Sequence, residues 1–199
     1  MGILYRPADG VAGDFIPFWW EGDYHLFYLK DYRGAPGRGE GVPWWHLVTR
    51  DFVHFDDWGE ALPRGPAGAQ DQWVFTGSVL AAGERFHIFY TGHNPQRKQQ
   101  GGCMQAVLRA DSDDLRAWTK RPEFFFPAPA EEGYEPDDWR DPFVFWNDEA
   151  KEYWMLLAAR RAAGPPRHRG LIALAASKDL HNWEVREPFW APDLYYTHE

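Results

Sequence analysis

The sequence is poor in cysteine, in basic charge and in long apolar runs, and each shortage excludes a class of protein. Its single cysteine, Cys103, rules out a disulfide within the chain and suggests no cysteine-based metal site. Acidic residues outnumber basic ones by 30 to 21, and the net charge of −9 disfavours a nucleic-acid partner, which needs a basic patch. No apolar run approaches the length of a membrane span. We therefore expect no metal or other cofactor, no nucleic acid and no membrane as a partner.

Sustained helical periodicity and a secretory leader are also missing. No stretch keeps the apolar spacing of an amphipathic helix, and Met1–Pro7 lacks the apolar core of a signal peptide, which predicts a cytoplasmic location. What the chain has in abundance is aromatic residues, 18% of the total with 12 Trp. Aromatic side chains suit strands packed face to face, and they also line carbohydrate sites, so their number alone does not choose between the two uses.

One pattern of residues occurs three times. The turn acids Asp51, Asp114 and Asp179 mark its period, with spacings of 63 and 65 positions. A period of this length indicates a repeat architecture. Each copy contains an opening phrase, then an aromatic strand, then a strand and turn: 13–18, 24–28 and 49–55 in the first copy, 75–80, 86–90 and 112–118 in the second, and 140–145, 153–157 and 177–183 in the third.

Each copy holds about four short runs of β-forming residues separated by turn residues, such as Glu21–Asp23 between the first two runs. One four-stranded antiparallel sheet, the blade of a β-propeller, fits such a unit. The sequence therefore predicts an all-β propeller, with blades at about 10–65, 70–128 and 135–190 and the start of a fourth at 194–199.

A blade needs a neighbour on each side to bury both of its faces, and propellers close with about four to eight blades. Three blades and a stub leave two open flanks. We therefore interpret residues 1–199 as one incomplete domain from a longer protein. A self-sufficient three-bladed domain is the less favoured alternative.

The opening phrases are the best candidates for the innermost strands, which line the channel of a propeller. In register, they place Asp14, Thr76 with Gly77, Asp141 and Glu199 at corresponding positions. Carboxylates brought together from different blades are what glycoside cleavage needs, one as general acid and one as nucleophile or base. An isolated aspartate at a strand end is more often a turn residue, and we interpret the repeated acids Asp51, Asp114 and Asp179 in that way. Asp14 and Asp141 differ because they stand beside apolar strand residues, where an unpaired acid is costly.

Taken together, these phrases resemble the five-bladed propeller glycoside hydrolases of family 32, which include invertases, levanases and inulinases and are related to families 68 and 43. Trp139–Phe145 is similar to the family's Arg-Asp-Pro motif, and this is the most specific match. Phe75–Ser78 is similar to its aromatic-Ser-Gly-Ser motif, Trp45–Phe55 to its Trp-x-His segment, and Tyr196–Glu199 to the approach to its Glu-Cys motif. The segment Tyr24–Tyr28 also matches the family's Tyr-His-Leu-Phe-Tyr strand.

The resemblance implies a role for each of these residues. Asp14 would be the nucleophile, Asp141 would stabilise the transition state by gripping sugar hydroxyls, and Glu199 would be the general acid and base. The residues implied to hold the sugar are Arg140, Thr76, Gly77, Ser78 and Trp45. The family opens with Asn-Asp-Pro-Asn-Gly where this chain has Gly13–Pro17, so the neighbours of the nucleophile are changed.

Three functions remain open at this point. The first is hydrolysis of fructosides or related furanosides. The second is the chemistry of family 43 on arabinosides or xylosides, where the same three acids would be base, pKa modulator and acid. The third is a non-catalytic propeller that binds carbohydrate or protein. The register of Asp14, Asp141 and Glu199 favours an enzyme, and we expect these 199 residues alone to be inactive.

Overall fold

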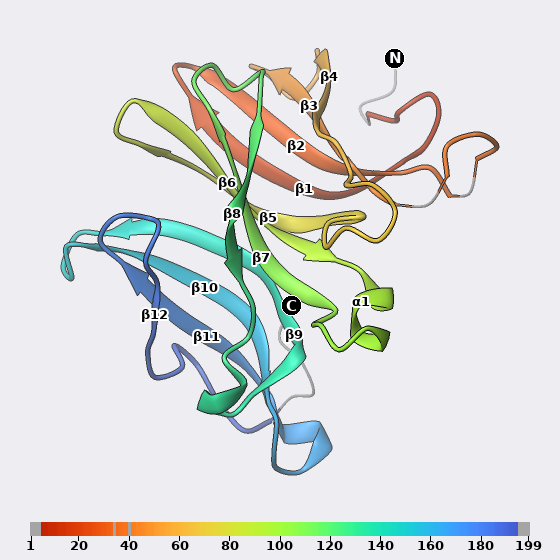
Figure 1. The fold of residues 1–199 in the computed structure, drawn as a ribbon. Helices are drawn as coiled ribbons and strands as arrows, with labels where there is room; N and C mark the ends of the chain where they lie inside the picture. Colours follow the sequence, from red (N-terminus) through yellow and green to blue (C-terminus); the bar gives the residue numbers. More distant parts are fainter. Residues whose placement is uncertain (1–4, 34, 40, 195–199) are drawn as a thin grey trace.

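The computed structural model describes residues 5–33, 35–39 and 41–194 (Figure 1). Strands dominate these residues, with one short helix, α1 (Pro95–Gln99), and two 3₁₀ turns at Ala130–Glu132 and Pro166–His168. The strands are β1 (Val11–Trp20), β2 (Asp23–Asp31), β3 (Trp44–Thr49), β4 (Asp56–Leu62), β5 (Trp73–Ala82), β6 (Arg85–His93), β7 (Gln105–Ser112), β8 (Thr119–Phe126), β9 (Tyr134–Asn147), β10 (Glu152–Arg161), β11 (Gly170–Ser177) and β12 (Glu184–Val185).

The described strands form three four-stranded antiparallel sheets, β1 to β4, β5 to β8 and β9 to β12, each with its strands in sequence order. The prediction of an all-β fold built from four-stranded antiparallel blades is confirmed. Tight hairpins join the first two strands of the first two blades, with Glu21 and Gly22 between the paired residues Trp20 and Asp23. Both loop residues have positive φ, 49° and 94°, which is the backbone of a type I′ turn.

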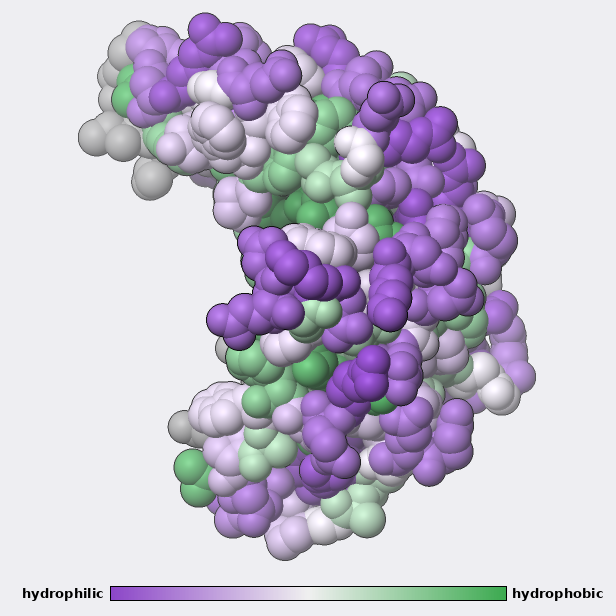
Figure 2. All heavy atoms as spheres, turned by 90° about the vertical axis from the view of Figure 1, so that its left-hand side faces the viewer, coloured by the Kyte–Doolittle hydropathy of each residue, from purple (hydrophilic) through white to green (hydrophobic). Residues whose placement is uncertain are grey.

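The first strands of the three sheets lie side by side, because β5 contacts both β1 and β9. The sheets follow one another along an arc (Figure 1). Seen from the side, the molecule has a curved outline that is hollowed along one edge (Figure 2). The strands β1, β5 and β9 are therefore the inner strands of the blades, and their side chains can meet across blade boundaries.

Two apolar clusters fill the spaces between neighbouring sheets. Ile88 and Tyr90 of β6 belong to the cluster shared with the first sheet, and Phe89 belongs to the cluster shared with the third. Successive side chains of a strand point to opposite faces, so apolar residues in a row mark a sheet that is covered on both sides. The first and third sheets also leave aromatic residues of their first strands in solvent, with Phe15 45% and Phe143 58% exposed.

The same turn follows β3, β7 and β11, and an aspartate organises it each time. The Asp114 Oδ1 atom accepts hydrogen bonds from the amides of Arg116 and Ala117, both at 2.8 Å. Asp51 and Asp179 accept equivalent pairs from the amides two and three positions ahead. These bonds lower the pKa of the Asp114 carboxyl. The interpretation of the three repeated acids as structural turn residues is confirmed.

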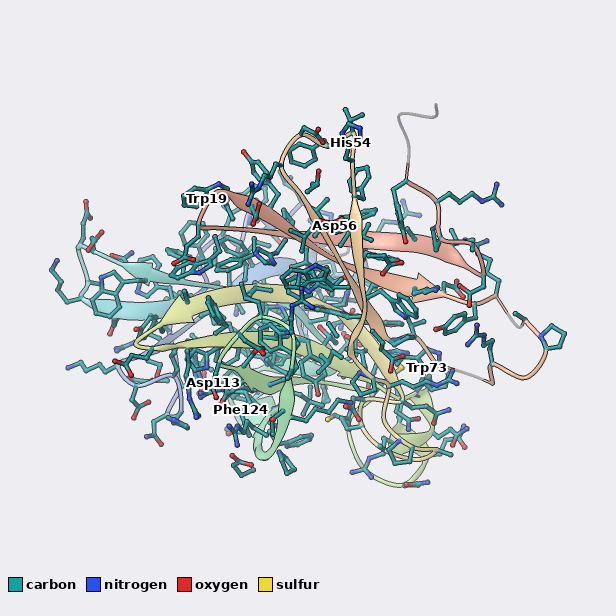
Figure 3. The ribbon with its side chains drawn as sticks, turned by 90° about the horizontal axis from the view of Figure 1, so that it is seen from above. Trp19, His54, Asp56, Trp73, Asp113 and Phe124 are labelled. Atoms are coloured by element: carbon teal, nitrogen blue, oxygen red, sulfur yellow. The ribbon has the colours of Figure 1, made fainter. Side chains whose placement is uncertain are left out.

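These turns, called the outer turns below, join the third strand of each blade to the fourth. The residue after each aspartate has a positive φ, 57° at Phe52, 63° at Leu115 and 62° at Leu180. A buried hydroxyl at the end of the preceding strand completes the turn; Thr49 Oγ1, for example, accepts from the amide of Phe52 at 2.9 Å. His54 stands at the outer tip of the first turn (Figure 3).

Candidate active site

Each of the three inner strands contains a β-bulge, and the bulges occupy corresponding places. In β1, Gly13 and Asp14 face the single residue Leu29, because Ala12 pairs with Lys30 and Phe15 with Tyr28. In β5, Thr76 is the extra residue, since Phe75 pairs with Thr91 and Gly77 with Tyr90. In β9, Asp141 and Pro142 face Leu157 alone. A bulge turns a side chain out of the regular alternation of a strand, which is why bulges are common beside active sites.

Asp14, Thr76 and Asp141 line one cavity of about 700 Å³. This volume lies within the range of small-molecule binding sites. The hydroxyl of Thr76 donates a hydrogen bond to Asp14 Oδ2 at 2.5 Å, and this bond links the first blade to the second. The opposite wall is apolar and comes from the third sheet and the segment after it: Phe143, Leu156, Leu157, Ala158, Ile172, Phe189 and Trp190. The cavity therefore combines two carboxylates and a hydroxyl with a hydrophobic wall.

Asp141 has an unusual backbone conformation. Its φ of 56° lies in the left-handed region, which residues other than glycine seldom adopt. Its amide donates to the hydroxyl of Thr91 at 2.8 Å, and the Arg140 Nε atom lies 3.6 Å from its Oδ2 atom. Strained conformations of this kind gather at functional sites, where the surrounding structure holds them.

Arg140 is largely buried beside Asp141. Its Nη1 atom donates to Asp138 Oδ1 at 2.7 Å, so a second carboxylate fixes the guanidinium. The charge of Arg140 also reaches His93, whose pKa is lowered, mainly by burial and secondarily by the positive charge of Arg140. His93 stacks on Phe75 with the ring centroids 4.5 Å apart, next to Thr76. This histidine is therefore neutral near pH 7.

Gly77 and Ser78 follow Thr76 on β5, and each fixes the position of a neighbouring strand. A Cβ atom on Gly77 would come within 2.0 Å of the carbonyl oxygen of Phe89, so the close approach of β5 and β6 requires glycine there. Ser78 is 3% exposed, and its hydroxyl accepts a hydrogen bond from the amide of Val144 at 2.9 Å. That bond joins β5 to β9. Neither residue lines the cavity.

The structure does not place Trp45 at the cavity that Asp14, Thr76 and Asp141 line. Trp45 is on β3, two strands away from the inner strand of its blade, and it is absent from the cavity wall. The Lys30 ammonium sits 3.4 Å from the centroid of its ring, as a cation–π contact. Residues 195–199 of the predicted fourth blade lie outside the described residues. They include Glu199, the third acid implied by the resemblance.

Thr91 and His93 were not singled out in the sequence, although both touch the residues at the cavity. They lie on β6, and the only local signal is that polar residues interrupt an apolar strand. Within the described ranges, no group of three or more His, Cys, Asp and Glu side chains could hold a metal ion. No helix in the same ranges has the length and apolar character to cross a bilayer.

Comparisons with known proteins place these features in a wider context. The model of the glycosyl hydrolases family 32 N-terminal domain matches residues 15–197. A levanbiose-producing levanase of Geobacillus stearothermophilus is 28% identical over 193 residues, covering 90% of this chain and 44% of the levanase. A cell wall β-fructofuranosidase of Zea mays is 30% identical, covering 89% of this chain and 29% of the relative.

Solved structures agree with this result. Fructan 1-exohydrolase IIa from Cichorium intybus superposes with a TM-score of 0.72 at 23% identity, covering 92% of this chain and 33% of that protein. Sucrose-6-phosphate hydrolase from Lactobacillus gasseri superposes with a TM-score of 0.70 at 26% identity, covering 90% of this chain and 34% of that protein. The chain thus spans less than half the length of these relatives.

Proposed function

The chain belongs to glycosyl hydrolase family 32, and we propose that the whole protein hydrolyses the O-glycosidic bonds of fructosides. Support comes from the relatives, which are named as levanases, β-fructofuranosidases and a sucrose-6-phosphate hydrolase. A further structural neighbour is a fructan 1-exohydrolase in complex with 1-kestose. The activity is proposed for the whole protein because the chain covers less than half of each of these relatives.

The observation that carries the proposal is the shared cavity of Asp14, Thr76 and Asp141. In the proposed mechanism, one oxygen of Asp14 attacks the anomeric carbon of the fructosyl group. The hydroxyl of Thr76 donates to Asp14 Oδ2, which fixes the orientation of the carboxylate and leaves the other oxygen to react. Orientation of this kind lowers the barrier because the reacting atoms are already close and aligned.

Asp141 and Arg140 are proposed to grip hydroxyl groups of the same sugar, from the next bulge along the row of inner strands. Glu199 is the proposed general acid. It protonates the leaving oxygen while the bond from Asp14 to the anomeric carbon forms, and it then takes a proton from the water that releases the sugar. Two displacements at the same carbon retain its configuration, which requires the nucleophile and acid carboxyls to lie about 5–5.5 Å apart.

A substrate series with the whole protein tests the proposal. Sucrose, levan and inulin are incubated separately, with arabinan as the matched furanoside control, and the released sugars are identified by chromatography. We expect fructose or fructo-oligosaccharides from at least one fructoside and no arabinose. The first anomer released, followed by NMR before mutarotation, should keep the configuration of the substrate. Release from arabinan alone, or an inverted first product, contradicts the proposal.

A further inference from the structure

Thr91 occupies a special place between two of the bulges. It lies on β6, the second strand of its blade, and its side chain is fully buried. The hydroxyl donates to the carbonyl oxygen of Thr76 at 3.1 Å and accepts from the amide of Asp141 at 2.8 Å. One side chain thus binds the backbone of two different blades, at Thr76 and Asp141, which both line the cavity.

The bulges explain why a hydroxyl is needed there. A bulge interrupts the ladder of backbone hydrogen bonds and leaves peptide groups without a partner on the neighbouring strand. A buried, unpaired carbonyl or amide is costly. A threonine hydroxyl can donate one hydrogen bond and accept another at the same time, so it satisfies the carbonyl of Thr76 and the amide of Asp141 together. Valine would fill the same space and satisfy neither group.

We infer that Thr91 is a positioning residue that holds Asp141 in register with Asp14. The connection runs from Asp14 through the hydroxyl of Thr76, along the peptide of Thr76, and through Thr91 to the amide of Asp141. The Asp141 backbone is in the left-handed region, and the hydrogen bond to Thr91 holds its peptide there. The inference rests on the proposed function, since it assigns Thr91 a role in that reaction.

Three variants of the whole protein test the inference by kinetics. Thr91→Val removes both hydrogen bonds at nearly constant volume, and Thr91→Ser keeps the hydroxyl. Thr49→Val is the matched control, because Thr49 is also buried and its hydroxyl also accepts from backbone amides, but in an outer turn. For hydrolysis of the best fructoside, we expect kcat to fall by about 10- to 100-fold in Thr91→Val with a much smaller change in KM. Thr91→Ser should restore most of kcat, and Thr49→Val should keep it.

Amide hydrogen exchange at Asp141 provides a readout that needs no activity. Loss of the bond to Thr91 should speed exchange of this amide by about tenfold in Thr91→Val, relative to neighbouring amides of β9. Thr91→Ser and Thr49→Val should leave the ratio unchanged. If Thr91→Val does not fold, Thr91→Cys takes its place, because a thiol is a weaker donor and acceptor, and an intermediate effect is expected.

The two readouts separate the possible failures. A wild-type protein that cleaves no fructoside contradicts the proposed function, and the exchange ratio then decides alone whether Thr91 holds Asp141. An active protein in which Thr91→Val keeps kcat, or in which Thr49→Val loses as much kcat as Thr91→Val, overturns the positioning role. An unchanged exchange ratio in Thr91→Val overturns it as well.

Discussion

The outer turns and the inner bulges of the three blades use their key residues in opposite ways. The outer turns carry the same acid in every copy, Asp51, Asp114 and Asp179, and each carboxylate accepts hydrogen bonds from the amides two and three positions ahead. The inner bulges occupy corresponding places but carry Asp14, Thr76 and Asp141. A residue that every blade needs in order to fold should be the same in every copy, as the turn aspartates are. The side chains at the bulges differ from blade to blade, which indicates that they serve the shared cavity and not the folding of each blade.

The largest expected effect separates the two kinds of aspartate by activity. Asp14→Asn in the whole protein keeps an oxygen that can accept from Thr76 but removes the proposed nucleophile. We expect kcat for fructoside hydrolysis to fall on the order of 10⁴-fold. Asp114→Asn is the matched control, since an amide oxygen can still accept from Arg116 and Ala117, and its kcat should stay within about twofold of wild type. Equal kcat values for the two variants would contradict a catalytic role for Asp14 that Asp114 lacks.

Two glycines, one in the bulge of β5 and one in the hairpin after that strand, sharpen the same comparison by stability. Gly77→Ala puts a methyl group against the carbonyl oxygen of Phe89 in the bulge, where the backbone must shift. We expect a loss of about 3 kcal/mol in the free energy of unfolding. Gly83→Ala, in the hairpin after β5, meets no atom within 4 Å and has only its φ of 60° to strain. That substitution should cost about 1 kcal/mol. Urea unfolding of both variants measures the difference, and equal losses would show that the bulge is not tightly packed.

The blade architecture could be predicted from the sequence because its causes are local. Turn residues such as Glu21–Asp23 lie next to runs of β-forming residues, and the acids of the outer turns bind amides only two or three positions away. Their period along the chain therefore reports the period of the fold. The positions of Asp14, Thr76 and Asp141 on successive inner strands follow from the same period.

Contacts between blades could not be predicted in this way. Thr91 joins Thr76 to Asp141 only because β5 and β9, which belong to different blades, both contact β6. No local sequence pattern indicates that contact. The tryptophan pair shows a second limit. Adjacent strand residues point to opposite faces, and the sequence does not say which faces the core. Trp44 is fully buried between two blades, and Trp45 lies on the other face, against Lys30.

A buried histidine, His46, and a histidine in an outer turn, His54, should affect the pH dependence of stability in opposite directions. His46, in the core of the first blade, lies 2.9 Å from His25, and its pKa is lowered to about 3 by burial and secondarily by the charge of His25. Below the ordinary histidine pKa, His46 is protonated in the unfolded chain but stays neutral in the folded chain. The free energy of unfolding should therefore fall as the pH drops below that pKa. From pH 6.5 to pH 5 this amounts to about 2 kcal/mol for His46 alone.

Replacement of the histidine checks this dependence. The variant His46→Gln cannot titrate, so its free energy of unfolding in urea should lose less than that of the wild type between pH 6.5 and pH 5. His54 in the outer turn is the control of opposite sign. Its pKa is raised by Asp51, so its contribution is present at low pH and is lost as the pH rises through the raised pKa. Parallel pH profiles for wild type and His46→Gln would contradict a neutral, buried His46.

The smallest expected effect belongs to a single outer turn. Asp179→Ala removes the acceptor for the amides of His181 and Asn182 and should lower the free energy of unfolding by about 1 kcal/mol at pH 7. These bonds lower the pKa of the Asp179 carboxyl, so its contribution is complete above the ordinary carboxyl pKa. The difference between variant and wild type should therefore shrink as the pH falls below about 4. Asp113→Ala, which removes only an exposed ion pair with Arg85, should change the urea midpoint less. A larger loss in Asp113→Ala would mean that the repeated turn bonds are not what stabilises the blade edges.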